Sequence, residues 1–178
     1  MKTHNYKSIG GWCNFEDIYS DMVQKHKKGH FVEIGTFFGK SASYMGVEIA
    51  NSGHDIKFDT IDTFEGSPDE IKGKHKIATQ VDMFAEAQKH LKDLPVNIIK
   101  NDSIKASRKY KKGTLDFVFV DGSHLYEDVK KDIEVWMKKV KKGGYIGGHD
   151  YDNKNVHKAV NELLGDCPAS ATSWLWQV

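Results

Sequence analysis

The feature that most constrains the fold is a regular alternation of short apolar runs with segments of helical periodicity. The apolar runs predict β-strands over residues 30–35, 56–62, 96–100, 115–121, 144–150 and 172–178. The segments around them predict α-helices over residues 15–28, 40–51, 81–94, 102–110, 124–140 and 154–164. Strands that alternate with helices form parallel sheets through right-handed crossovers, with helices on both faces. The chain is therefore expected to fold as a three-layer α/β sandwich.

Two helix ends have specific sequence signals. Asn14 is the expected N-cap of the first helix, which ends before Gly29. The helix over 124–140 carries a long amphipathic stripe and is expected to be closed by Gly143-Gly144.

Polar residues follow or end five of the predicted strands. In parallel α/β sheets, ligands bind beyond the carboxyl ends of the strands, so these residues should gather at one edge. They are Glu33 and Gly35, Asp62, Asn101 and Asp102, Asp121, and His149 and Asp150.

The stretch EIGTFFGKS (33–41) ends like the phosphate-binding loop of nucleotide hydrolases. That loop has four residues between its glycines, whereas three separate Gly35 from Gly39, and isoleucine stands where the first glycine should be. A dinucleotide-binding G-x-G-x-x-G is also absent, because Phe37 replaces its middle glycine. A nucleotide hydrolase and a dinucleotide dehydrogenase are therefore disfavoured, and the final Lys-Ser is interpreted as the start of the next helix.

E-x-G-x-x-x-G-x-S resembles the first motif of class I S-adenosylmethionine-dependent methyltransferases, and the resemblance extends over most of the chain. Asp62 in TIDTFEG matches the acid that binds the ribose hydroxyls, and Asp102-Ser103 in KNDSIKAS matches the adenine contact. The resemblance implies a Rossmann-like, mainly parallel sheet of six or seven strands in the order 3-2-1-4-5, extended by an antiparallel C-terminal strand. The donor-binding residues that it implies are Glu33, Gly35, Thr36, Gly39, Ser41, Asp62, Thr63, Asp102, Ser103 and Asp121.

The second half, VFVDGSHLYEDVKKDIEVWMKKVKKGGYIGGHDY, is similar to the macrocin-O-methyltransferase-like branch of this family. Its D-G-x-H-x-Y-x-x-V block and terminal G-G-x-x-x-x-H-D-Y are the most specific features. Members of the branch methylate hydroxyls of sugars or related small molecules, often with a divalent metal, and the metal positions fall on Asp121, His149 and Asp150. Carboxylates suit Mg²⁺, whereas the imidazole, where some relatives have a second Asp, shifts the preference toward transition ions.

His124 is the candidate general base, because a neutral imidazole near pH 7 can accept the hydroxyl proton. It follows Asp121 by three residues, at the start of a predicted helix. In the alternative interpretation, His124 only caps that helix or bonds the adenine side of the donor. Metal held by Asp121 and Asp150 is a second way to acidify the hydroxyl.

Two segments are expected to shape the site. The N-terminal helical segment, residues 1–29, should pack on or over the donor, with Trp12, Phe15 and Tyr19 either covering it or belonging to the core. The polar stretch from Thr63 to Gln80 is either a short-helix insertion or a mobile functional loop.

Composition bounds the remaining classes. With 26 Lys and Arg against 25 Asp and Glu, the chain has no global electrostatic case for nucleic acid. Two cysteines define no disulfide framework, and no apolar run approaches the roughly 20 residues of a membrane span. One cytoplasmic domain over residues 1–178 is expected, with a small-molecule hydroxyl acceptor as partner. A homodimer that completes the sheet edge is an alternative to a monomer, and a donor-binding protein without catalysis is the alternative to an enzyme.

Overall fold

The computed structural model describes residues 1–66, 81–170 and 172–178. Its strands form one six-stranded sheet in the order β3-β2-β1-β4-β5-β6, in which β5 and β6 pair antiparallel and the other neighbours pair parallel. The strands are β1 Lys28–Ile34, β2 Asp55–Asp62, β3 Asn97–Lys100, β4 Leu115–Val120, β5 Val140–Gly148 and β6 Trp174–Gln177. The expected strand order and the antiparallel C-terminal strand are both confirmed.

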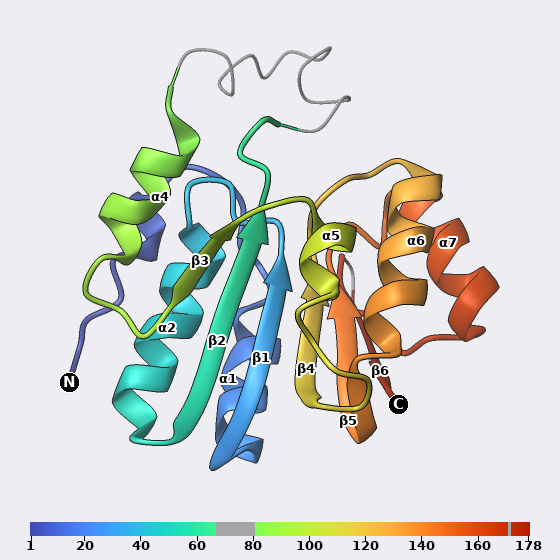
Figure 1. Cartoon of the computed structure of the whole chain (residues 1–178), viewed down its shortest axis with the longest axis horizontal. Helices are drawn as coiled ribbons and strands as arrows, with labels where there is room; N and C mark the ends of the chain where they lie inside the picture. Colours follow the sequence, from blue (N-terminus) through green and yellow to red (C-terminus); the bar gives the residue numbers. More distant parts are fainter. Residues whose placement is uncertain (67–80, 171) are drawn as a thin grey trace.

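Helices cover both faces of this sheet (Figure 1). They are the 3₁₀ turn η1 Tyr6–Ser8 and the helices α1 Glu16–Lys25, α2 Lys40–Ser52, α4 Met83–Leu91, α5 Ser103–Ser107, α6 Tyr126–Met137 and α7 Lys154–Leu164. One core cluster joins α1, α2 and α4 to one face, through residues such as Tyr19 and Leu91. A second cluster joins α5, α6 and α7 to the other face, through residues such as Ile133 and Val160. The predicted three-layer sandwich is therefore confirmed.

The two central strands explain why the sequence shows continuous apolar runs. Phe31 of β1 pairs in register with Phe117 of β4, and Val32 pairs with Val118. The two phenylalanines face the α1–α2 layer and the two valines face the α6–α7 layer. All four side chains are at most 1% exposed, because a parallel sheet with helices on both faces leaves neither face to solvent.

Two predicted helix boundaries were wrong. Phe15, not Asn14, stands at the N-cap of α1, with no side-chain cap, because the Asn14 side chain is bonded elsewhere. Helix α6 ends at Met137 rather than at Gly143-Gly144, and both glycines lie inside β5. A Cβ on Gly144 would lie 2.9 Å from the Asp116 carbonyl oxygen, so glycine there permits the close approach of β4 at a register shift.

Most of the loop that was predicted after Thr63 lies outside the described residues. Among the residues that are described, none of the helices combines the length and the apolar character needed to cross a membrane.

Candidate functional site

A cavity of about 700 Å³ opens at the carboxyl edge of the sheet. Its volume lies within the range of about 300–1,000 Å³ that is typical of small-molecule sites. It brings together the following sequence-predicted site residues: Gly35, Thr36, Ser41, Asp62, Thr63, Asp102, Ser103, Asp121, His124, His149 and Asp150. Two other predicted residues, Glu33 and Gly39, are next in sequence to lining residues but do not line the cavity themselves.

The loop after β1 is held close to the loop after β4. Gly35 has φ +96°, and a Cβ there would lie 1.9 Å from the carbonyl oxygen of Asp121. One carboxylate oxygen of Asp62, at the end of β2, accepts hydrogen bonds from the backbone N–H groups of Thr36 (2.8 Å) and Phe37 (2.9 Å). Phe37 itself has φ +49°, a left-handed conformation that costs energy in a bulky residue. Gly35 and Asp62 together hold the backbone of the loop after β1, which forms one wall of the cavity.

Glu33 lies behind that wall and is completely buried. Its carboxylate accepts hydrogen bonds from the Tyr19 hydroxyl at 2.7 Å and the Thr60 hydroxyl at 2.6 Å. Burial raises the pKa of Glu33 to about 7, although the hydrogen bonds from Thr60, Tyr19 and Ser41 oppose this shift. Thr60 in turn lies 2.6 Å from the Thr36 hydroxyl in the cavity wall. Glu33 therefore supports the wall from inside the core.

A second buried acid, Asp132, lies on the α6 side of the cavity and was missed in the sequence. Ser103 donates a hydrogen bond to it, while Asp102 caps α5 by accepting from the Lys105 N–H at 2.8 Å. Burial raises the pKa of Asp132 to about 7, and the nearby acids Asp102 and Asp128 add to the shift. A signal was available in the sequence, because this acid interrupts the apolar stripe of the predicted helix over 124–140.

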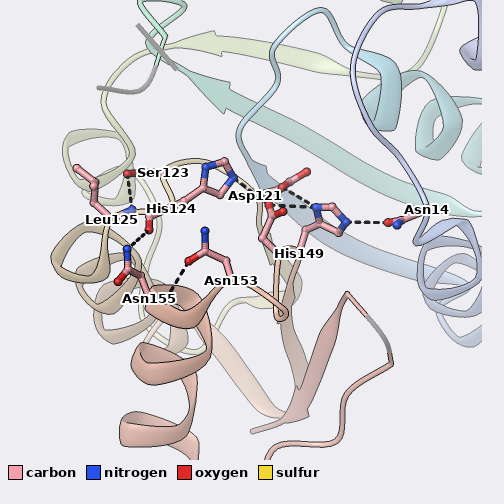
Figure 2. A network of polar contacts seen from close by, with 9 residues as sticks. Asn14, Asp121, Ser123, His124, Leu125, His149, Asn153 and Asn155 are labelled. Atoms are coloured by element: carbon pink, nitrogen blue, oxygen red, sulfur yellow. Dashed lines mark hydrogen bonds and ion pairs between the residues drawn. The ribbon is translucent and has the colours of Figure 1, made fainter. Parts of the chain in front are cut away.

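Two histidines and two aspartates line the cavity beyond the ends of β4 and β5. Figure 2 labels His124, Asp121 and His149 of this cluster. One oxygen of Asp150 lies 2.9 Å from Nε2 of His124 and 3.1 Å from Nδ1 of His149. Nδ1 of His149 also lies 3.5 Å from Asp121, and its Nε2 lies 2.7 Å from Oδ1 of Asn14. Asp150 has φ +55°, so the backbone holds it in a left-handed conformation at this junction.

The charges in this cluster are strongly coupled. Burial lowers the pKa of His149, but the carboxylates of Asp121 and Asp150 outweigh burial and raise it to about 10. Burial raises the pKa of Asp150, but hydrogen bonds and charge from His124 and His149 outweigh burial and hold it well below its ordinary value. At neutral pH the cluster therefore holds ionised Asp150 against a cationic His149 ring.

The same atoms fit a divalent cation. Ligand atoms of Asp121, His149 and Asp150 all lie within 4.8 Å of one another. Asn14 Oδ1 can only accept, so Nε2 of His149 carries a hydrogen and Nδ1 faces the two carboxylates. Once a metal displaces the proton from Nδ1, this is the arrangement of a metal-binding histidine whose second nitrogen is held by an outer partner.

Three further residues of the cavity wall were not singled out in the sequence. Two of them, Gly10 and Gly11, belong to the N-terminal segment and line the cavity together with Trp12, which is 64% exposed. Lys40 lines it as well, and its Nζ donates to the Gly11 carbonyl oxygen at 2.9 Å.

Comparisons with known proteins identify the family of the chain. A family described as a methyltransferase domain matches residues 32–151, which is more than half of the chain.

Two curated relatives are uncharacterized proteins. R132 of Acanthamoeba polyphaga mimivirus is 38% identical over 63 residues, covering 33% of this chain and 28% of that protein. The protein y4gI of Sinorhizobium fredii is 23% identical over 147 residues, covering 83% of this chain and 16% of that protein. The chain thus spans less than a third of either relative.

Solved structures share the fold at low sequence identity. The O-methyltransferase NovP matches with a TM-score of 0.71 and 21% identity, over 92% of this chain and 78% of that one. CalS11, a TDP-rhamnose 3′-O-methyltransferase, matches with a TM-score of 0.58 and 16% identity, over 92% of this chain and 77% of that one. A precorrin-8w decarboxylase of Methanobacterium thermoautotrophicum matches with a TM-score of 0.64 and 13% identity, over the full length of both chains. Such similarity shows the fold, and the family match shows the family: the chain belongs to the methyltransferase domain family, and its fold is that of class I S-adenosylmethionine-dependent methyltransferases.

Proposed function

We propose that the chain transfers the methyl group of S-adenosylmethionine to a hydroxyl of a sugar or other small molecule. The proposal rests chiefly on one observation: a His124–Asp150 pair lies 2.9 Å apart in the same cavity as the predicted donor-binding acid Asp62. When bound, S-adenosylmethionine supplies an electrophilic methyl group on its sulfonium. The similarity to a TDP-rhamnose O-methyltransferase supports a sugar as the acceptor class.

Donor binding is assigned to the β2 and β3 ends of the cavity. Asp62 already accepts backbone hydrogen bonds from Thr36, Phe37 and Phe64, and a carboxylate has about four lone-pair sites. The remaining capacity suits a ribose hydroxyl. Asp102 and Ser103 line the same cavity beyond β3, where the adenine is expected.

Proton removal is assigned to His124. Ionised Asp150 accepts from Nε2–H of His124, so the other ring nitrogen, Nδ1, carries the lone pair. A carboxylate that fixes the tautomer in this way also stabilises the imidazolium that forms when the base accepts a proton. His124 would thus deprotonate the acceptor hydroxyl while the cavity walls align it with the donor, and alignment supplies most of the rate gain.

The cluster of Asp121, His149 and Asp150 gives the site a second means of acidifying the hydroxyl. A divalent ion held by these three residues would lower the pKa of a hydroxyl that binds to it. Mg²⁺ and transition ions are both compatible with this ligand set, and the imidazole favours the latter.

The test is calorimetric titration with S-adenosylmethionine, S-adenosylhomocysteine and ATP, each with and without Mg²⁺. We expect both adenosyl ligands to bind, ATP not to bind, and Asp62→Ala to weaken the adenosyl ligands. Asp55→Asn is the matched control, because Asp55 begins the same strand in an exposed ion pair with Lys28. Binding of ATP with Mg²⁺ but not of S-adenosylmethionine would refute the proposal.

Turnover is then measured with a panel of hydroxyl acceptors, with added Mg²⁺ or Mn²⁺ and with a chelator. Methyl transfer that the chelator abolishes would assign the metal to the reaction. Tight donor binding without turnover on any acceptor would favour the alternative of a non-catalytic donor-binding protein.

A further inference from the structure

Lys40 is the residue of EIGTFFGKS that a phosphate-binding loop would have used and that the proposed chemistry leaves unexplained. It is the first residue of α2, and the first turn of this helix contains no acid. A lysine at the positive end of a helix dipole is unfavourable for the helix itself. Its position in the cavity wall therefore calls for a reason other than helix formation.

The contacts of Lys40 leave its charge uncompensated by the described part of the chain. Its Nζ donates to the Gly11 carbonyl oxygen at 2.9 Å, and no described carboxylate lies within ion-pair distance of it. The only other lysine in the described lining, Lys131, lies on α6 next to the buried acid Asp132.

The rest of the lining holds more acids than cations, and its cationic ring, His149, already faces the carboxylates of Asp121 and Asp150. Its described carboxylates are Asp62, Glu65, Asp102, Asp121, Asp128, Asp132 and Asp150. A ligand that carries a carboxylate of its own is repelled by such a wall unless a cation meets it.

We propose that Lys40 binds the α-carboxylate in the methionine portion of the donor. The inference rests on the proposed donor, because S-adenosylmethionine combines an adenosyl group with an amino-acid carboxylate. The ammonium of Lys40 has three hydrogens, so it can hold this carboxylate while it keeps its bond to Gly11. Lys40 thus connects the bound donor to the N-terminal segment that lines the cavity at Gly10–Trp12.

The test compares two ligands that differ only in the carboxylate: S-adenosylhomocysteine and its decarboxylated form, which keeps the amine. Calorimetry is run on the intact chain and on Lys40→Met, Lys40→Arg and Lys131→Met. A charge-assisted hydrogen bond predicts that Lys40→Met binds S-adenosylhomocysteine about 10- to 100-fold more weakly. The decarboxylated ligand should bind Lys40→Met within about 2-fold of the unsubstituted chain, because the substitution removes no contact to it. Lys40→Arg should restore most of the affinity, and Lys131→Met should show no carboxylate-dependent loss.

Each other outcome is informative. An equal loss for both ligands, or no loss, overturns the inference, since Lys40 would then act only on the structure of the wall or not at all. A carboxylate-dependent loss in Lys131→Met but not in Lys40→Met also overturns it. If the unsubstituted chain binds neither ligand, the proposed function itself fails.

Discussion

Asn14 Oδ1 accepts a hydrogen bond from Nε2 of His149 at 2.7 Å, which joins the N-terminal segment to a residue 135 positions later in the chain. The bond requires a hydrogen on Nε2 and turns Nδ1 toward Asp121 and Asp150. Asn14 is therefore the outer partner that orients the proposed metal ligand.

Replacing Asn14 should weaken metal binding. Loss of an outer partner of a metal-bound histidine typically costs about 10- to 100-fold in metal affinity, and we expect Asn14→Ala to fall in this range. Titration with Co²⁺, followed by its visible absorption, measures this without an activity assay. Asn51→Ala is the control, because the Asn51 side chain bonds the backbone of Lys2 at the C-terminal end of α2 and does not line the cavity. Unchanged Co²⁺ affinity in Asn14→Ala would show that His149 does not use this partner to bind metal.

Asp132 should make the protein less stable as the pH rises. Its pKa is about 7 in the folded chain and 3.8 ordinarily, so the folded state binds more protons than the unfolded state between these values. The contribution of Asp132 to stability is therefore greatest below pH 3.8, the ordinary pKa, and it decreases up to about pH 7. The decrease is at most about 1.4 kcal/mol per pH unit. Urea unfolding at pH 5, 6, 7 and 8 should show a shallower decrease for Asp132→Asn than for the unsubstituted chain.

Two features sharpen this measurement. Glu33 has the same raised pKa and the same sign, so Asp132→Asn should reduce the decrease rather than abolish it. Glu127→Gln is the matched control on α6, because Glu127 is exposed and is not among the groups that shift the pKa of Asp132. If Asp132→Asn and Glu127→Gln have the same pH profile, Asp132 does not take up a proton in the folded state.

Alanine substitutions at Gly35 and Gly53 distinguish two contributions to the free energy of unfolding: the strain of a positive φ and the clash of an added Cβ. Both have positive φ, +96° and +68°, but a Cβ on Gly53 meets nothing within 4 Å, whereas one on Gly35 meets Asp121 at 1.9 Å. Gly53→Ala should cost about 1–2 kcal/mol from backbone strain alone. Gly35→Ala should cost more than about 4 kcal/mol, or prevent folding, because the loops after β1 and β4 must separate. Equal losses in urea unfolding would mean that the two loops are not held together as the structure shows.

The sequence was sufficient for the sheet and for the acids that follow its strands at the cavity, for a common physical reason. Apolar runs such as the one around Phe31 identify strands buried on both faces, and residues that follow such strands must meet at one edge. That reasoning placed Asp62, Asp121 and Asp150 correctly at one cavity.

What the sequence did not reveal depends on contacts between distant segments. Asn14 is a good N-cap by type, and only the tertiary structure shows that His149 takes its side chain. Lys40 fits the start of a helix by position, and only its place in the cavity wall gives it another role. The helix predicted over 124–140 ran too long, because the strand β5 competes for the residues from Val140 onward by pairing with β4.

His124 is the proposed base, and a glutamine at this position removes its basic nitrogen. His124→Gln keeps a donor that can reach Asp150 but has no nitrogen that accepts a proton near neutral pH. We expect kcat for methyl transfer to fall by about 10²- to 10⁴-fold, the usual contribution of general base catalysis. Affinity for S-adenosylhomocysteine should change little, because the substitution removes proton transfer and not a predicted donor contact.

The control and the pH profile decide between this role and a structural one. His157→Gln removes an exposed histidine of α7 that does not line the cavity, and it should leave kcat unchanged. In the unsubstituted chain kcat should rise with pH and level off once the base has lost its proton. In His124→Gln the residual rate should instead rise in proportion to hydroxide without levelling off. Reduced donor affinity with an unchanged pH profile would instead assign His124 to the adenine side of the cavity and leave proton removal to the Asp121–Asp150 cluster.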